Sequence, residues 1–149
     1  SSAASDVYKR QSIYIICNYV NGPNYLTTDQ IKEMVDSGLV SVQTHTLSHR
    51  ELTSLSLEEM EKELVESKKY LDSTYNINVD TICYPIGKYN DTIVHKAKEI
   101  YKYGLAMTGG VYNSKKHDLY RIPRIYANRS MTINQFANYL KQSNVEIIY

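Results

Sequence analysis

The sequence lacks tryptophan and has a single phenylalanine, three prolines and two cysteines among its 149 residues. The cysteines, Cys17 and Cys83, lie far apart in apolar, strand-like surroundings. Such a pair does not form the disulfide framework of a small secreted domain, so we expect two buried thiols that pack as small hydrophobic residues. No apolar run approaches the roughly 20 residues that cross a bilayer, and no signal peptide opens the chain. We therefore expect neither a membrane-spanning segment nor a targeting signal in this chain.

An excess of charge of one sign is also missing. The 17 Lys and Arg residues are balanced by 16 Asp and Glu, for a formal net charge of +1. Because the two signs are interspersed, the sequence offers no basic stripe for a phosphate backbone, and we expect no nucleic-acid partner. The length and a hydrophobic content of 42% are typical of one globular domain.

The first eleven residues, SSAASDVYKRQ, do not share the richness in Tyr, Lys, Asn and Ile of the rest of the chain. They resemble the translation of a transposase adapter that is used to prepare sequencing libraries. We interpret residues 1–11 as a non-native leader and residues 12–149 as part of a domain whose gene continues upstream. The alternative is a polar native tail.

Hydrophobic periodicity predicts strands that alternate with helices. Strands are predicted at 13–20, 39–43, 81–84, 105–108, 121–126 and 145–149, and helices at 29–37, 57–75, 91–103 and 132–142. This alternation indicates βαβ units and a parallel sheet, so the predicted fold class is α/β. Ligands of such folds gather at the carboxyl ends of the strands. The loops after Gln43, Tyr84 and Thr108 are therefore the candidate site.

The first of these loops contains two histidines, His45 and His49, four residues apart. On one side of a helical turn their imidazole nitrogens can converge on a divalent cation. The alternative is a pair of polar loop histidines that bond backbone groups. A catalytic zinc site normally has three protein ligands and an open position for water, so the pair alone does not complete one.

Several segments, in the same order and spacing, resemble motifs of one family. They are Leu26-Thr27, Gly38-Leu39-Val40, Thr44-His45-Thr46-Leu47-Ser48-His49-Arg50-Glu51-Leu52 with Leu55-Ser56, Tyr84-Pro85-Ile86-Gly87-Lys88-Tyr89-Asn90, Leu105-Ala106-Met107-Thr108 and Arg121-Ile122-Pro123-Arg124-Ile125. The family is that of the polysaccharide deacetylases, the NodB-homology domain of carbohydrate esterase family four. The resemblance covers residues 12–142.

The resemblance implies a distorted (β/α) barrel, here incomplete because the first strand and helix of the family fold are missing. It also implies a divalent metal, most commonly zinc, held by His45, His49 and an aspartate. That aspartate and a second one, the catalytic base, belong to an acidic motif on the first strand that this sequence does not contain. We therefore expect the third ligand to be absent from this chain and the fragment itself to be inactive.

Carried over residue by residue, Pro85 and Ile86 match the segment whose backbone N–H stabilises the oxyanion. Tyr84 and Tyr89 flank the same segment and are candidates for stacking on sugar rings, the alternative being packing residues with a wet hydroxyl.

The family arginine that positions the catalytic acid aligns with Cys83, so that task falls to Arg124 or, as a weaker candidate, Arg121. The alternative for Arg124 is a cation at the barrel rim. His95 and His117 are expected to be solvated, and the late histidine motif that supplies the family's general acid is not visible.

The function implied by the resemblance is hydrolytic deacetylation of N-acetyl or O-acetyl sugars in a cell-wall or extracellular polysaccharide. The substrate partner would be that acetylated polysaccharide, and the parent protein would be secreted or attached to the cell surface. One alternative is a non-catalytic glycan-binding relative of the deacetylases. A second is an unrelated α/β metal-binding or sensor domain, which would leave the matches at 84–90 and 121–125 unexplained.

Overall fold

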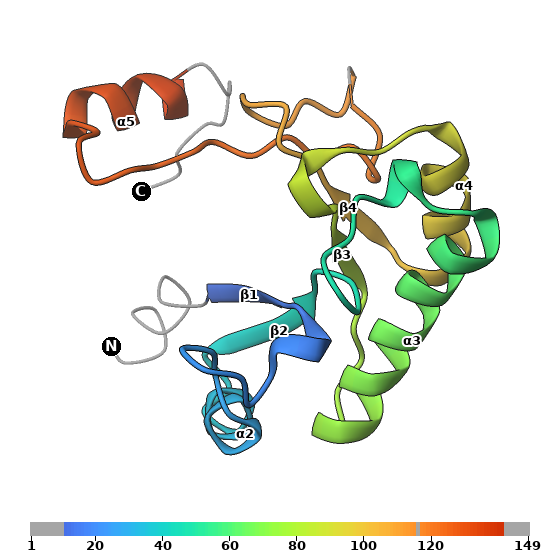
Figure 1. Cartoon of the computed structure of the whole chain (residues 1–149). Helices are drawn as coiled ribbons and strands as arrows, with labels where there is room; N and C mark the ends of the chain where they lie inside the picture. Colours follow the sequence, from blue (N-terminus) through green and yellow to red (C-terminus); the bar gives the residue numbers. More distant parts are fainter. Residues whose placement is uncertain (1–10, 116, 142–149) are drawn as a thin grey trace.

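The protein was analysed as a computed structural model that describes residues 11–115 and 117–141 (Figure 1). The elements are β1 (Gln11–Ile15), η1 (Cys17–Tyr19), α2 (Thr28–Asp36), β2 (Val40–Thr44), η2 (Leu52–Ser54), α3 (Leu57–Tyr75), β3 (Thr81–Cys83), η3 (Pro85–Gly87), α4 (Asp91–Ile100), β4 (Tyr103–Leu105) and α5 (Ile133–Lys141), where η marks a short 3₁₀ helix. The predicted α/β class is confirmed.

The four strands form one parallel sheet in the order β1-β2-β3-β4. The longest pairing joins β1 to β2, from Gln11 opposite Val40 to Ile15 opposite Thr44. Among the described residues β1 pairs only with β2, so it is an edge of the sheet. The sheet is therefore open, a partial version of the barrel that the resemblance implied.

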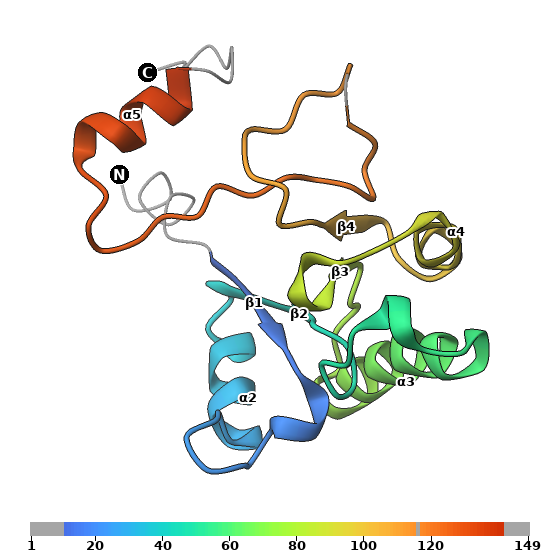
Figure 2. The same ribbon diagram turned by 45° about the horizontal axis from the view of Figure 1, so that its top comes forward.

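The helices cover the sheet as the alternating pattern requires. Figure 1 shows α2 beside β1 and β2, and α3 and α4 beside β3 and β4. In Figures 1 and 2, α5 stands apart from the sheet, at the end of a long segment that forms no helix or strand in its described residues. Within residues 11–115 and 117–141, no helix has both the length and the apolar character needed to cross a membrane.

Helix α3 begins and ends at the predicted residues because both ends are capped. At its start the Ser56 side chain accepts a hydrogen bond from the Glu59 N–H, and the Glu59 side chain accepts one from the Ser56 N–H. At its end Asn76 takes the left-handed conformation, with φ 52°. The inner face buries Met60, Glu63, Leu64, Ser67, Leu71 and Tyr75. This face packs into a core that also contains Val42, Val79 and Ile82.

The predicted strand at 13–20 is wrong in its second half. The strand β1 ends at Ile15, and the chain then turns into the 3₁₀ helix η1. The reason lies in the partners of its backbone: the N–H groups of Cys17 and Asn18 donate to the carbonyls of Thr46 and Leu47, 3.2 and 2.9 Å away. The apolar run is thus partly used to hold the loop after β2 rather than to lengthen the sheet.

The predicted helix at 91–103 is wrong at its end, because α4 ends at Ile100 and Gly104 lies inside β4. A Cβ atom at Gly104 would collide with the Tyr84 hydroxyl and the backbone of Tyr120, so only glycine fits there. The predicted strand at 121–126 is reduced to a single bridge between Leu105 and Ile122. The next residue, Pro123, has no N–H to continue a ladder. The predicted strand at 145–149 lies outside the described residues.

Candidate functional site

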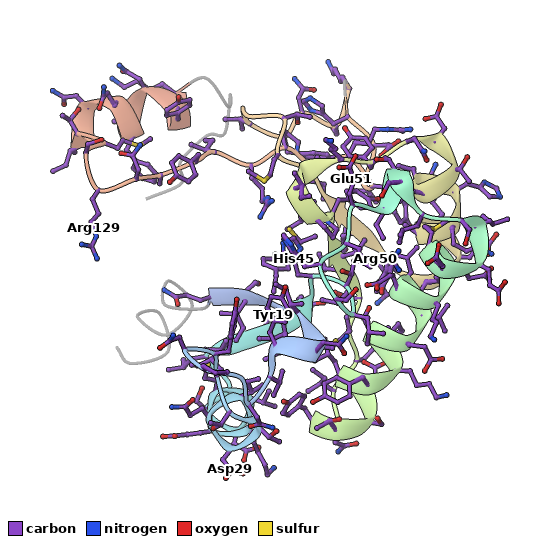
Figure 3. All side chains as sticks on the ribbon, viewed as in Figure 1. Tyr19, Asp29, His45, Arg50, Glu51 and Arg129 are labelled. Atoms are coloured by element: carbon purple, nitrogen blue, oxygen red, sulfur yellow. The ribbon has the colours of Figure 1, made fainter. Side chains whose placement is uncertain are left out.

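The two histidines lie side by side at the carboxyl end of β2. His45 directly follows the strand, and its N–H donates to the carbonyl of Ile15 at 2.8 Å. The ring centroids of His45 and His49 are 4.6 Å apart, with the ring planes at 71°. Figure 3 places His45 near the centre of the molecule, where the sheet and the loops meet. The structure therefore brings together the pair that the spacing singled out.

A backbone contact fixes the tautomer of His45. Its Nδ1 lies 2.7 Å from the carbonyl oxygen of Cys83, at the end of the neighbouring strand β3. Because a carbonyl only accepts, Nδ1 carries the proton and Nε2 keeps its lone pair. Histidines that ligate metals are usually oriented by such a contact through the other ring nitrogen.

The charge state of His45 suits the same role. Burial lowers the pKa of His45 below its ordinary value; His49 and Arg124 lower it further, and the hydrogen bond to Cys83 opposes them. The imidazole is therefore neutral near pH 7, the state in which it can ligate a metal.

The loop between the histidines takes two uncommon backbone conformations. Thr46 and His49 lie in the left-handed region, with φ of 70° and 61°, and each costs about 1–2 kcal/mol relative to an ordinary conformation. Buried hydroxyls offset this cost: Thr44 Oγ1 accepts from the Thr46 N–H at 3.1 Å, and Thr46 Oγ1 accepts from the His49 N–H at 3.2 Å. The direction of the His49 ring thus depends on these two threonines.

Sequence reasoning missed one residue beneath this loop, Glu63. Its side chain is buried, and its carboxylate accepts hydrogen bonds from Leu47 and Ser48. The signal in the sequence was a charged residue inside the apolar stripe of the best-defined helix, between Met60 and Leu64.

The residues present fit part of a metal centre. Two imidazoles, at least one with a free Nε2, are suitable nitrogen donors. The described residues contain no group of three or more His, Cys, Asp or Glu that could hold a metal ion. The nearby Cys83 thiol is buried, which raises its pKa and keeps it protonated, so it is a poor ligand.

The turn after β3 contains the predicted oxyanion residues. Pro85 is buried, whereas Ile86 is 53% exposed and has φ 59° and ψ 5°, a conformation that a β-branched residue rarely adopts. Gly87 and Lys88 donate to the carbonyls of Tyr84 and Pro85, both at 3.1 Å. Among the described residues the Ile86 N–H donates to no acceptor. The turn therefore presents a free N–H next to the strand end that holds His45.

The prediction that Tyr84 contacts a sugar is contradicted by its position. Its side chain is fully buried, and its hydroxyl donates to the Tyr120 carbonyl at 3.0 Å. The space that it fills is the one left by the missing side chain of Gly104. Tyr89 is half-buried and lies against Tyr84, with ring centroids 5.1 Å apart. Of the two tyrosines only Tyr89 keeps exposed surface, so a sugar contact stays a prediction for Tyr89 alone.

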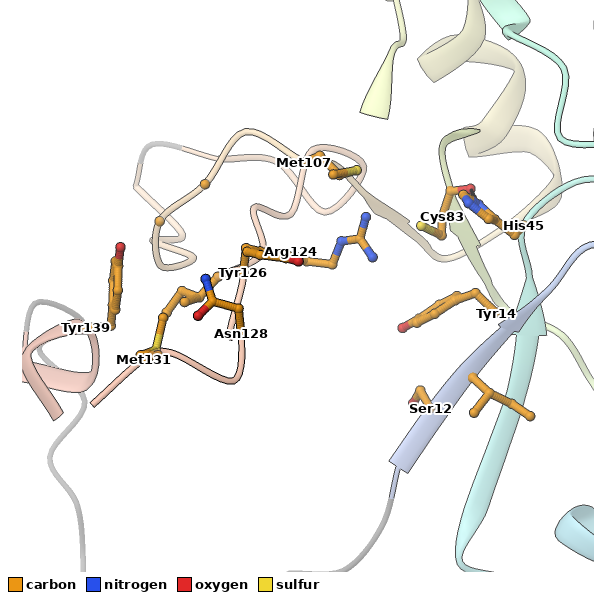
Figure 4. Close-up of a pocket in the computed structure, with 14 residues that line it drawn as sticks. Ser12, Tyr14, His45, Cys83, Met107, Arg124, Tyr126, Asn128, Met131 and Tyr139 are labelled. Atoms are coloured by element: carbon orange, nitrogen blue, oxygen red, sulfur yellow. Dashed lines mark hydrogen bonds between the residues drawn. The ribbon is translucent and has the colours of Figure 1, made fainter. Parts of the chain in front are cut away.

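A cavity of about 870 Å³ opens beside His45 and Cys83 (Figure 4). Its lining comes from β1, the ends of β2 and β3, the segment between β4 and α5, and α5 itself: Ser12, Ile13, Tyr14, His45, Cys83, Met107, Gly109, Gly110, Arg124, Ile125, Tyr126, Asn128, Met131 and Tyr139. Arg124 donates from Nε to the Ala106 carbonyl at 3.1 Å, and its guanidinium points toward Cys83 and His45. The structure thus places Arg124 on the lining of the same cavity as His45, and its positioning role stays a prediction.

The other histidines lie elsewhere. His95 is exposed on α4, with Nε2 3.7 Å from Glu99. His117 lies in the loop after β4, where its Nδ1 accepts a hydrogen bond from the Asn113 N–H at 3.0 Å.

Comparison with known proteins agrees with this geometry. A family model described as "Polysaccharide deacetylase" matches residues 7–105. The Bacillus subtilis protein YxkH is 28% identical over 133 residues, which is 89% of this chain and 47% of that protein. The poly-β-1,6-N-acetyl-D-glucosamine N-deacetylase of Staphylococcus aureus is 30% identical over 126 residues, 75% of this chain and 43% of that protein.

A crystal structure of a Bacillus cereus polysaccharide deacetylase superposes with a TM-score of 0.82 at 32% identity, over 88% of this chain and 42% of that one. The chain spans less than half the length of each of these three relatives. The family match covers well over half of the chain, in agreement with the parallel sheet and the histidine pair. The chain belongs to the polysaccharide deacetylase family.

Proposed function

We propose that this chain forms part of a metal-dependent enzyme that hydrolyses the acetyl groups of an N-acetylated or O-acetylated polysaccharide. The observation that carries the proposal is the histidine pair, in which His45 is oriented by the Cys83 carbonyl at 2.7 Å, together with the turn at Ile86 that follows the same strand β3. Ligand nitrogens and an oxyanion donor at the carboxyl ends of neighbouring parallel strands are part of what hydrolysis of an acetyl group needs.

The ion in this proposal is divalent, with zinc as the expected metal, and His45 and His49 would hold it. When bound, such an ion supplies Lewis acidity, which polarises the acetyl carbonyl and lowers the pKa of water. The chain's own residues contribute the rest: the neutral His45 offers Nε2, and the Ile86 N–H donates to the oxygen that gains negative charge. Arg124 orients the acidic groups of the complete site from across the cavity.

On this proposal the 149-residue chain does not turn over substrate and binds zinc weakly at best. The described residues provide the two imidazoles without a third ligand near them. The absence of a general base costs a further factor of roughly a hundred or more. Activity is therefore expected only where an acidic motif supplies the third ligand and the base.

The proposed substrate is an acetylated glucosamine polymer at the cell surface or outside the cell. The support is the Staphylococcus aureus relative, whose name specifies poly-β-1,6-N-acetyl-D-glucosamine. The parent protein is accordingly proposed to be secreted or attached to the cell surface.

A non-catalytic glycan-binding protein is the second candidate. It is favoured by Cys83, a protonated thiol at the position where the family pattern has an arginine. A protein that only binds sugar would have no need to position a catalytic acid.

One experiment separates the two candidates. Acetate release from a β-1,6-linked N-acetylglucosamine oligomer is measured for the longer gene product, in wild-type form and as His45→Ala. Release that requires zinc and disappears in His45→Ala supports the enzyme. Oligomer binding without release, unchanged in His45→Ala, supports the binding protein and overturns the proposed reaction.

A further inference from the structure

A buried carboxylate lies directly beneath the loop that joins the two histidines. Glu63, on the inner face of α3, is 5% exposed. Its Oε2 accepts hydrogen bonds from the N–H groups of Leu47 and Ser48, at 3.0 and 2.9 Å, and its Oε1 accepts one from the Ser48 hydroxyl. All three donors belong to the segment between the histidines.

The same two peptide units are held from the opposite side by η1. The carbonyl of Thr46 accepts from the Cys17 N–H and that of Leu47 accepts from the Asn18 N–H. The unit that joins Thr46 to Leu47 and the unit that joins Leu47 to Ser48 therefore each have their carbonyl bonded to η1 and their N–H bonded to Glu63. With both ends fixed, neither peptide plane can rotate without breaking a hydrogen bond.

Burying the Glu63 carboxylate costs free energy, and an apolar side chain at this position would fill the core without that cost. Removing a carboxylate from water is unfavourable, and charge-assisted hydrogen bonds offset the penalty only when the acceptor oxygens are well satisfied. The neighbours of Glu63 on the buried face of α3 include Met60 and Leu64, so an apolar residue would continue the stripe. The carboxylate instead satisfies donors that the left-handed turn at Thr46 directs inward.

We propose that Glu63 is a positioning residue that sets the backbone of the histidine loop, so that the His49 ring faces His45. It touches neither ring and acts through the peptide units at Leu47 and Ser48. The inference rests on the proposed function in one respect: the ring arrangement matters because the pair holds a metal ion.

The test compares four variants of the whole chain with the wild type. Glu63→Gln removes the charge and replaces one of the two acceptor oxygens by an NH2 donor, so at least one contact is lost and the others are weakened. Ser48→Ala removes only the hydroxyl contact. Glu66→Gln alters a carboxylate of the same helix whose side chain is 45% exposed. Leu71→Val takes a methylene from the core two turns further along α3 and controls for a general loss of stability.

Three quantities are measured by NMR below the melting temperature: amide hydrogen exchange at Leu47 and Ser48, the nuclear Overhauser contact between the two imidazoles, and zinc affinity by titration of their ring resonances. Glu63→Gln is expected to speed exchange at both amides, weaken the inter-ring contact and lower zinc affinity by about tenfold, as changes behind metal ligands do. Ser48→Ala moves each quantity in the same direction by a smaller factor. Glu66→Gln and Leu71→Val leave all three at wild-type values.

A folded Glu63→Gln protein with wild-type exchange at Leu47 and Ser48 and an unchanged inter-ring contact overturns the inference. So does Leu71→Val producing the same loop changes, since the role of Glu63 would then be general stability. If Glu63→Gln does not fold, Ser48→Ala decides by the same criteria. Weak or absent zinc binding by the wild-type chain follows from its missing third ligand. In that case amide exchange at Leu47 and Ser48 and the inter-ring contact decide the role of Glu63, and acetate release by the longer protein decides the proposed function.

Discussion

The histidine loop and the turn at Tyr84–Lys88 follow neighbouring parallel strands, and both contain non-glycine residues at positive φ, but they are held very differently. In the first, Thr46 and His49 are fixed by buried hydroxyls and by Glu63. In the second, Ile86 is exposed and the local hydrogen bonds come only from the two residues after it. On the proposed function this difference has a reason, because a pair of metal ligands must be held in one geometry, whereas an oxyanion donor needs an accessible N–H.

The turn still depends on the core through one side chain. Tyr84→Ala would empty a fully buried site and leave the Tyr120 carbonyl without its donor. We expect the free energy of unfolding to fall by about 3–5 kcal/mol, as for other buried aromatic residues. Urea denaturation followed by circular dichroism measures it. Tyr89→Ala, at a half-buried position, should cost clearly less, and equal losses would contradict the assignment of Tyr84 to the core.

The histidine loop should be sensitive to one hydroxyl. Thr46→Val keeps the β-branched shape but removes the acceptor of the His49 N–H. An N–H left without a partner in a buried setting costs about 1–3 kcal/mol, so we expect a loss of stability in that range. Thr46→Ser keeps the hydroxyl and serves as the control. Thermal melts of both variants check the expectation, and a Val variant as stable as the Ser variant would show that the hydroxyl does not hold the loop.

At the turn after β3, by contrast, we expect a substitution to raise stability, because it relieves backbone strain at Ile86. Ile86→Gly removes the β-branched side chain from a left-handed conformation, which glycine adopts without penalty. We expect stability to rise by about 1 kcal/mol, the cost of that conformation less the added freedom of the unfolded chain. Ile86→Val is equally branched and should change little. A destabilised glycine variant would mean that side-chain packing, not backbone strain, dominates at this turn.

Short sequence patterns predicted the features of the fold that depend on residues close together in the sequence. The start of α3 follows from the Ser56 and Glu59 capping box. The spacing of the histidines predicted that their rings lie together, but the segment forms no helical turn, and the rings meet through left-handed backbone at Thr46 and His49. The bonds of Glu63 to residues fifteen and sixteen positions earlier depend on how α3 packs, which periodicity does not show.

The burial of Tyr84 was missed for a similar reason. It requires the gap at Gly104, which appears only once β3 and β4 pair. The strand predicted at 121–126 forms only one bridge. Pro123 already argued against a strand there, but the apolar residues around it dominated the prediction.

The smallest expected effect is a pH dependence of stability that arises at the buried His45 ring and has no counterpart at the exposed turn around Ile86. Burial, then the charges of His49 and Arg124, lower the pKa of His45 below its ordinary value of 6.5, against the opposing Cys83 hydrogen bond. The unfolded chain therefore binds more protons than the folded one below that pH, and stability must fall as the pH is lowered from 6.5 toward the folded pKa. Below the folded pKa the loss is complete and the contribution becomes constant.

Urea midpoints measured from pH 7.5 to pH 5 in wild type and His45→Gln report on this contribution, because the variant lacks the imidazole at position 45 and keeps the rest of the sequence. The wild type should lose more stability than the variant over that interval. If the urea midpoints of the two proteins changed equally with pH, His45 would be as easily protonated in the folded protein as in the unfolded one. Burial would then not be the reason that the His45 imidazole is neutral.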